Sequence, residues 1–364
     1  MTGSISTILR WKAFRLASRF LLGKTFGEAM LGTSASLDVE DDVVLSDLRA
    51  HVRERRRISG PETVFYRYSD AAPDYFREAS VYGTKSAWLL SDVFVSPKHG
   101  ASWTPEGRLL QESVTNLATF YLFGGPAETA LRSAVDGGTT PLVPLRSNLV
   151  YYHTLLDDIP QLLHALDFCP EARILLAAKH PAYIDGILEF LGIDRSRIVL
   201  SDRPVRVRSC VFVPKQTRTS FIRPCDLSRL RQAVLPRIRD AGSARRLYVS
   251  RRGTPLRAFE NERDLESALA SAGFDVLRFE DLAFADQMAA VRSAGVVVAP
   301  HGSGLANLVA AREGTRVVEI MHPGWIRSTF PRLSSQLSLD HRLVLAETDR
   351  IPLETVLRHL EDLP

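Results

Sequence analysis

The stretch "SAGVVVAPHGSGLANLVAAREGTRVVEI" (residues 293–320) decides the fold. Its first nineteen residues contain no Lys, Arg, Asp or Glu, but a proline and two glycines interrupt the apolar run near its middle. Residues 296–298 are valines that carry no charge toward either face, as a central strand of a parallel sheet requires. The stretch therefore predicts a buried strand, a sharp turn, a buried helix and a second strand over 315–321, and not a membrane span.

The turn at residues 300–304 has the features of an anion-binding site. Glycines allow the backbone to approach a ligand closely, and the first N–H groups of the following helix are unpaired and carry the positive end of its dipole. Ligands of open α/β sheets bind at such carboxyl ends of strands. The alternative is a tight turn in which the glycines serve only the geometry.

Two familiar motifs do not fit this turn. A dinucleotide fingerprint needs a third glycine where Asn307 stands, and it follows the first strand of its domain and not a late one. A serine-hydrolase elbow needs glycines at positions 301 and 305, which are His301 and Leu305.

A second candidate element is the loop in "YVSRRGTPLRAFENE" (residues 248–262), which contains Arg251, Arg252 and Arg257. It follows a predicted strand of the same sheet, so the carboxyl-end rule places it near the turn at 300–304. Arginine side chains beside a helix N-terminus suit a diphosphate, because they form charge-assisted bidentate hydrogen bonds. The alternative is a set of solvated surface arginines.

A third candidate element is the helix predicted for "YYHTLLDDIPQLLHAL" (residues 151–166), interrupted near Pro160. His153 and Asp157 are four residues apart, so they share one helical face. A carboxylate beside an imidazole can orient it or raise its pKa, which is the pattern of a general base. A plain contact on the helix surface is the alternative. Metal sites are not expected, because the chain has no H-E-x-x-H and no D-x-D after a strand.

Alternating strand and helix patterns predict two α/β domains with parallel sheets and a cleft between them. We expect a helical and irregular arm over residues 1–60, an acceptor-side domain over 61–222 and a ligand-binding domain over 223–364. Residues 217–226 are expected to form the linker. The "RERRR" run at 53–57 suits a solvated helix face.

The composition is that of a globular protein without nucleic-acid-binding character. The net charge is +4, only six of the 46 basic residues are lysine, and no basic run alternates with aromatics. Three cysteines without metal-type spacing indicate a reducing compartment, and no signal peptide is visible, so we expect a cytoplasmic protein. Residues 5–22 are basic and partly amphipathic. They suit either peripheral binding to the inner face of the membrane or packing on the protein.

Taken together, residues 245–320 resemble the signature region of glycosyltransferase family 61. The resemblance rests on an arginine-rich loop followed by "R…NE" and a helix, then "EDLAFADQ", "APHGSGLANL" and "GTRVVEI". The helix at 151–166 is similar to the upstream histidine-and-acid helix of that family. One departure is Thr154, since a tryptophan commonly follows the histidine there. The first 140 residues show no match.

The resemblance implies a GT-B-like fold, in which two Rossmann-like domains face a cleft, and an inverting, metal-independent transfer from a nucleotide sugar, usually a UDP sugar. It also implies a glycan or lipid-linked glycan acceptor in capsular or other surface polysaccharide biosynthesis. Either Asp157 or His153 would remove the acceptor proton, and no cofactor is expected. The donor-binding residues would be Arg251, Arg257, Asn261, Glu262, His301, Gly302, Ser303, Gly304 and Asn307.

Glu319 ends the strand that follows the turn and its helix. From that position it is expected to accept hydrogen bonds from a ribose, with a helix-cap or core contact as the alternative. For the whole chain, the alternative to an enzyme is a non-catalytic scaffold that binds a nucleotide sugar or phosphate. A nicotinamide oxidoreductase is disfavoured by Asn307 and by the late position of the glycine motif.

Overall fold

The computed structural model describes residues 51–69, 72–76, 79–106, 110, 113, 128–147, 150–214, 222–239, 242 and 245–361. All of these belong to one compact unit, Leu48–Pro364. The amphipathic segment at 5–22 and most of the predicted arm lie outside the described residues. None of the described helices is both long and apolar enough to cross a bilayer.

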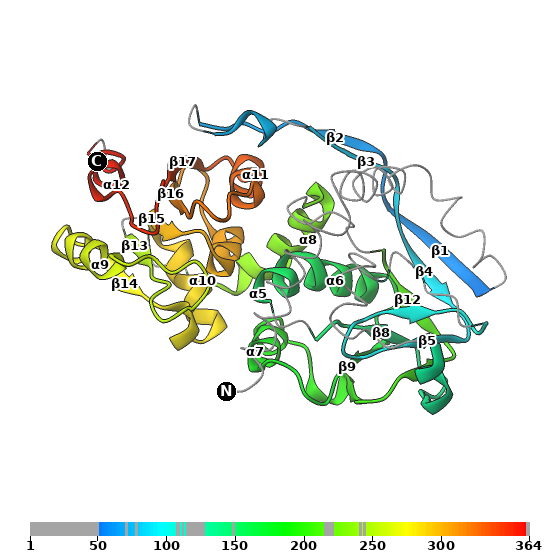
Figure 1. Ribbon diagram of the computed structural model, residues 1–364. Coiled ribbons are helices and arrows are strands. Elements are labelled where there is room, and N and C mark those ends of the chain that lie inside the picture. Colours follow the sequence, from blue (N-terminus) through cyan, green and yellow to red (C-terminus); the bar gives the residue numbers. More distant parts are fainter. Residues whose placement is uncertain are drawn as a thin grey trace, which may run out of the picture. The chain divides into compact units, whose positions relative to one another are not determined.

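The C-terminal part of the chain forms a five-stranded sheet in which every neighbouring pair of strands is parallel. This confirms the parallel sheet predicted here. In spatial order its strands are β14 (Asp275–Leu277), β13 (Arg245–Val249), β15 (Ala294–Pro300), β16 (Arg316–Met321) and β17 (Asp340–Leu345). Four α-helices alternate with these strands along the chain (Figure 1): α9 (Glu262–Ser271), α10 (Phe284–Arg292), α11 (Thr329–Gln336) and α12 (Leu353–Arg358).

Both faces of this sheet are buried, which explains the charge-free sequence of β15. Alternate residues enter two separate hydrophobic clusters, because side chains along a strand point to opposite faces. Val297 and Ala299 lie in one cluster, which includes Met288 of α10. Val296 and Val298 lie in the other, with Leu265 of α9 and Val356 of α12. A charge on either face of this strand would therefore be buried without a partner.

The segment after β15 differs from the prediction. Residues Ser303–Ala310 form a 3-10 helix, η10, and not an α-helix. Its turns close between residues three apart, as in the hydrogen bond of 3.0 Å from the Leu305 amide to the Gly302 carbonyl. Four helices contact η10: α10, α11, α5 (Tyr151–His153) and α8 (Pro224–Val234). A 3-10 helix is wound more tightly than an α-helix, which suits a segment enclosed in this way.

The N-terminal part of the chain builds a six-stranded mixed sheet, which contains the predicted parallel strands and adds antiparallel ones. Its order is β1 (Val52–Ser59), β4 (Lys85–Leu90), β12 (Cys210–Phe212), β8 (Leu142–Pro144), β9 (Arg173–Leu176) and β10 (Ile198–Leu200). The last four strands are parallel to one another, and β1 and β4 add antiparallel pairs.

Strand β1 also corrects the helix face expected at residues 53–57. These residues form an exposed strand at the edge of the sheet, where Arg55 donates a hydrogen bond to Ser86 and lies over the ring of Trp88. Charged residues on an edge strand discourage pairing with further strands, which accounts for the density of arginine there.

Smaller elements complete this part. Strand β11 (Val205–Val207) belongs to a four-stranded sheet with β5 (Val93–Val95), β6 (Ser102–Trp103) and β7 (Val135–Asp136). A separate ribbon pairs β2 (Glu62–Val64) with β3 (Ser80–Tyr82). Helix α7 (Ala182–Phe190) is followed by Gly192, whose φ of 72° is typical of a glycine that ends a helix. Short 3-10 helices are η3 (Asp74–Phe76), η5 (Glu128–Ser133), η7 (Arg195–Arg197), η8 (Leu235–Arg237) and η9 (Phe279–Asp281).

The helix predicted for residues 151–166 is continuous but contains a π-helical turn. It consists of α5 (Tyr151–His153), the π-helical segment η6 (Thr154–Asp158) and α6 (Ile159–Phe168). Pro160 has no N–H to donate within the helix, and the preceding amide, Ile159, bonds five residues back to Thr154. The interruption was therefore predicted at the correct place, and its form is a π turn, a feature frequent at functional sites.

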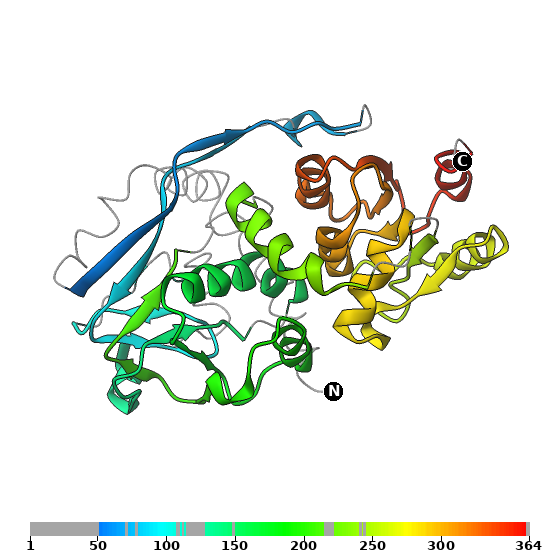
Figure 2. The same ribbon diagram turned by 180° about the vertical axis from the view of Figure 1, so that it is seen from behind.

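A buried ion pair fastens helix α8 (Pro224–Val234) to the N-terminal sheet, and α8 lies beside α6 in both views (Figure 1 and Figure 2). Residues 224–226, predicted as linker, begin this helix. The Lys85 ammonium contacts both carboxylate oxygens of Asp226 at 2.5 and 2.6 Å, and Gln161 and His164 of α6 complete the network. The side chains of Lys85 and Asp226 are only 5% and 3% exposed.

Substituting Lys85 by Met should destabilise the protein strongly, because Asp226 would remain buried without its cation. We expect a loss of about 3–5 kcal/mol in the free energy of unfolding, measured by urea denaturation. The control is Arg350→Met, which removes a pair with Glu260 whose side chains are 60% and 66% exposed, and it should leave stability unchanged. Equal stability of the two variants would show that the buried pair does not hold α8.

Candidate functional site

The turn after β15 is shaped by the approach of Arg251 to Gly302. The Arg251 guanidinium donates through Nη1 to the His301 carbonyl at 2.7 Å and through Nη2 to the Leu256 carbonyl at 3.2 Å. A Cβ on Gly302 would lie 2.7 Å from both Cδ and Nε of Arg251, whereas the backbone of Gly302 is extended and unstrained. Position 302 is therefore glycine because an arginine passes over it.

The second glycine of the turn, Gly304, also faces close neighbours. A Cβ there would lie 3.3 Å from the Phe279 ring and 3.4 Å from Val249. Ser303 lies between the two glycines, half-buried, and its hydroxyl hydrogen-bonds to none of the described residues. The turn thus packs tightly on one side and leaves one hydroxyl without a protein partner in the part of the chain that the structure describes.

Glu262 and Asn261 hold the loop that carries Arg251. One carboxylate oxygen of Glu262 accepts hydrogen bonds from the Arg251 amide at 2.6 Å and from the Tyr248 hydroxyl at 3.1 Å. The Asn261 amide both donates to and accepts from the backbone of Ile351, at 3.0 and 2.7 Å. Both side chains are buried and directed into the protein. The structure therefore places these two predicted donor-binding residues behind the loop.

Arg257 lies in a cluster of positive charge beside this loop. Its guanidinium lies 5.2 Å from the ring centre of Trp325, and the Arg327 guanidinium lies 4.1 Å from the same ring. Burial, followed by the charges of Arg251 and Arg327, lowers the pKa of Arg257 to about 10. No ion pair joins Arg257 to a carboxylate of the described residues. The guanidinium groups of Arg251, Arg257 and Arg327 thus lie close together, and Arg257 has no carboxylate partner among the described residues. Such a cluster favours the binding of an anion.

Trp325 and Arg327 were missed by the sequence analysis. They belong to "HPGWIRS" (residues 322–328), which follows β16 directly. The rule that pointed to Arg251, that ligands collect at the carboxyl ends of parallel strands, applies equally to this segment and could have found them.

His301 is bonded to a buried glutamate. Its Nδ1 lies 2.5 Å from Oε1 of Glu319, and the other oxygen of Glu319 lies 3.1 Å from Nε2 of His341. Burial alone would raise the pKa of Glu319, but the charges and hydrogen bonds of the two histidines outweigh it and hold the pKa below its usual value. Both oxygens of Glu319 are thus engaged inside the protein, and His341 is a further residue that sequence analysis missed.

The predicted pair of His153 and Asp157 is formed. Nδ1 of His153 lies 2.6 Å from Oδ2 of Asp157, which is buried in the π-helical turn, while the imidazole is partly exposed. The next residue, Asp158, accepts a hydrogen bond of 3.0 Å from Nε of Arg146. The π turn therefore buries two consecutive carboxylates and gives each its own basic partner.

A short hydrogen-bonded chain joins this helix to η10. The Tyr151 hydroxyl donates to Oδ1 of Asn307 at 2.5 Å, and Nδ2 of Asn307 donates to Gln287 of α10 at 2.8 Å. Burial raises the pKa of Tyr151 well above its usual value, so that its hydroxyl remains a donor. Asn307 is fully buried and both of its amide atoms are used. It acts as a connection between the two helical segments.

An aromatic contact completes the link between the two histidines. The Tyr152 ring centre lies 5.0 Å from His153 and 5.8 Å from Phe330, and Phe330 lies 5.2 Å from His301. The structure thus brings together two imidazoles, each with Nδ1 on a buried carboxylate and each with an Nε2 that bonds to none of the described residues. Asn261 does not belong to this group, because it points toward Ile351.

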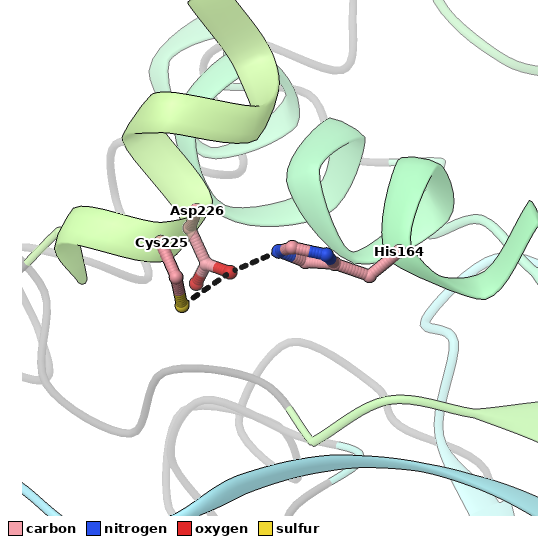
Figure 3. Close-up of side chains that lie close together, drawn as sticks. All are labelled: His164, Cys225 and Asp226. Carbon is pink, nitrogen blue, oxygen red and sulfur yellow. Dashed lines mark hydrogen bonds and ion pairs between the residues drawn. The ribbon is translucent and has the colours of Figure 1, made fainter. Parts of the chain in front are cut away.

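The side chains of His164, Cys225 and Asp226 approach one another closely enough to resemble a metal site (Figure 3). Their candidate ligand atoms lie within 4.8 Å of one another. The ammonium of Lys85 already contacts both carboxylate oxygens of Asp226, so a positive charge stands where a cation would bind. The group therefore fits a buried ion pair better than it fits a metal.

Residues 151–318 match the sequence profile of a family described as Glycosyltransferase 61, a little under half of the chain. The matched range contains the helix with His153 and Asp157, the Arg251 loop and the turn at 301–304. No curated protein matches the chain. The family match makes the chain a glycosyltransferase, so the alternatives of a non-catalytic scaffold and a nicotinamide oxidoreductase are set aside.

Substituting Gly302 by Ala should displace Arg251 while the protein stays folded, because the clashing atoms belong to a flexible side chain. We expect binding of pyrophosphate, measured by isothermal titration calorimetry, to weaken about tenfold as one charge-assisted contact is lost. The matched control is Gly186→Ala in α7, where the nearest atom would lie 3.9 Å away. Unchanged affinity in the Gly302 variant would separate Arg251 from anion binding.

Proposed function

We propose that this glycosyltransferase, identified by its family 61 domain at residues 151–318, moves a sugar from a nucleotide donor to a glycan hydroxyl with inversion and without a metal ion. The observation that carries the proposal is the Tyr151–Asn307 contact, which joins an imidazole–carboxylate pair to a turn where arginines gather. We further propose a GT-B-like arrangement of two Rossmann-like domains over 61–222 and 223–364, with the site between them.

The arginine cluster is proposed to hold the diphosphate of the donor, and a UDP sugar is the proposed donor. Arg251, Arg257 and Arg327 offer bidentate hydrogen bonds to phosphate oxygens, and the charge of a diphosphate would relieve their mutual repulsion. The N–H groups at the start of η10 and the Ser303 hydroxyl add further donors at the turn.

His153 is proposed as the general base, with Asp157 as the group that orients it. Because Nδ1 of His153 is bonded to Asp157, its Nε2 is the nitrogen available to an acceptor hydroxyl. In the proposed step, Nε2 takes the hydroxyl proton while the oxygen forms a bond to the anomeric carbon. The bond from that carbon to the phosphate oxygen breaks, and its electron pair leaves with the nucleoside diphosphate. Attack from the side opposite the leaving group inverts the anomeric centre.

Four of the predicted donor-binding residues are proposed to support this site from behind. Glu262 and Asn261 fix the Arg251 loop, and Asn307 fixes η10 against α5. Glu319 is proposed to hold His301 in place of the ribose contact expected from the sequence, since its two oxygens already bind histidines. This division of roles leaves His301, Arg251 and Arg257 to face the donor.

For the cellular setting, we propose a cytoplasmic enzyme of surface polysaccharide biosynthesis that acts on a glycan or lipid-linked glycan. Peripheral binding to the membrane through residues 5–22 is part of this proposal. A lipid-linked acceptor would favour an enzyme held at the membrane surface by a basic amphipathic segment. The capsular setting rests on the resemblance to family 61 alone.

Substituting His153 by Ala should lower kcat by about 100-fold to 10,000-fold, because general base catalysis contributes that much. The measurement is release of UDP from the UDP sugar that gives the largest thermal shift in a panel. Binding of UDP itself should not change. The control, His180→Ala, removes another imidazole that contacts a carboxylate, Asp185 at 3.2 Å, and should keep full activity. Full turnover by the His153 variant would eliminate it as the base.

Substituting Arg257 by Gln should weaken UDP binding about 10-fold to 100-fold, since it removes one cation from the proposed diphosphate site. Arg252→Gln is the matched control from the same loop, because Arg252 is exposed and pairs with Glu266 at 3.4 Å. Calorimetry with UDP compares the two. Similar affinities for both variants would place the diphosphate elsewhere.

A further inference from the structure

Behind the turn at 301–304, four side chains form a buried hydrogen-bonded chain that crosses two strands and a helix. It runs from His301 to Glu319 of β16, then to His341 of β17 and to Ser334 of α11. The three contacts measure 2.5 Å, 3.1 Å and 2.7 Å. All of the polar atoms that link these residues lie in the interior.

The charge balance of this chain favours a proton on one imidazole. Glu319 is 0% exposed, and its hydrogen-bonding and ion-pair partners among the described residues are the two histidines. A buried carboxylate without a neighbouring cation is strongly unfavourable. The lowered pKa of Glu319 agrees with an ionised carboxylate. An imidazolium at one of the two histidines would supply that neighbouring cation.

The hydrogen-bonding pattern indicates that His301 holds this proton. Ser334 is fully buried, and its hydroxyl can donate to Nδ1 of His341. His341 would then be a neutral imidazole that donates from Nε2 to Glu319. Among the described residues His301 has no such partner on Nε2, so both of its nitrogens can carry a proton. Arg251 bonds to the His301 carbonyl, and its positive charge opposes this proton.

We propose that Ser334, His341 and Glu319 are positioning residues that keep His301 as an imidazolium, with its Nε2–H directed to the departing diphosphate. This inference rests on the proposed function. As the bond between the anomeric carbon and the phosphate oxygen breaks, the electron pair moves to that oxygen. The Nε2–H of His301 donates a hydrogen bond to it, and the proton stays on His301. The proton of the acceptor hydroxyl goes to His153.

The charge of His301 can be measured directly. Imidazole nitrogen resonances of protein labelled with ¹⁵N-histidine, assigned with a His301→Gln variant, report the protonation of each ring. We expect His301 of the wild-type protein to be an imidazolium at neutral pH. In Glu319→Gln the counter-ion is removed, so the imidazolium resonances of His301 should be lost at neutral pH. The resonances of His180, whose carboxylate partner is Asp185, should be unchanged.

His341→Gln tests which histidine holds the proton, because the amide can still donate to Glu319 but cannot be protonated. If His301 already carries the proton, its nitrogen resonances at neutral pH should remain those of an imidazolium in this variant. A His301 that is neutral in the wild-type protein and becomes an imidazolium in the variant would overturn the proposal, since it would show that His341 had carried the charge. A neutral His301 in the wild-type protein would overturn it as well, even if no variant folds.

Addition of UDP separates this inference from the proposed function. We expect UDP to shift the Nε2 resonance of wild-type His301 and to bind at least about tenfold more weakly to Glu319→Gln. An imidazolium that does not respond to bound UDP would overturn the leaving-group assignment, while turnover of the UDP sugar would still support the proposed function. Absence of turnover by the wild-type protein, with an intact UDP response, would count against the proposed function and would leave only a contact between His301 and the diphosphate.

Discussion

The close approach of the Arg251 side chain to the backbone of Gly302 is the contact on which the candidate site depends. Because Gly302 carries no side chain, the Arg251 guanidinium can reach the His301 carbonyl at the carboxyl edge of the parallel sheet. The Glu262 carboxylate accepts a hydrogen bond from the backbone amide of Arg251 and so fixes the start of the same loop. The burial of both faces of β15 supplies the rigid strand from which the turn starts. The glycines therefore serve both geometry and the placement of charge.

The second requirement is that the helix carrying His153 meets this turn. Tyr151 and Asn307 provide that contact, and the π-helical turn before Pro160 buries Asp157 beside His153. Each histidine thus has a carboxylate on Nδ1 and an Nε2 that bonds to none of the described residues. In the proposed reaction one imidazole removes a proton and the other stabilises negative charge. Their surroundings differ, since the His153 imidazole is partly exposed whereas His301 is bonded to a carboxylate deep in the sheet, and this suits those different tasks.

Sequence patterns predicted a parallel sheet in the C-terminal part but not its last strand, β17, because only the strands buried on both faces are charge-free enough for the pattern to detect. The pair of His153 and Asp157 followed from helical spacing alone. Strand β1 was missed because its exposed arginines show no alternation of apolar and polar residues. The 3-10 geometry of η10 depends on contacts with four helices from other parts of the chain, and a local sequence pattern does not reveal such contacts. Trp325, Arg327 and His341 stand in segments without a recognised motif. Only the topology brings them to the turn.

The central claim is that a nucleoside diphosphate binds at the turn between the arginines and His301. A crystal structure of the complex with UDP tests it most directly. The account predicts phosphate oxygens within hydrogen-bonding distance of Arg251, Arg257 and Nε2 of His301, with the side of the site next to His153 left for the acceptor. A diphosphate bound at a place that none of these side chains reaches would contradict it.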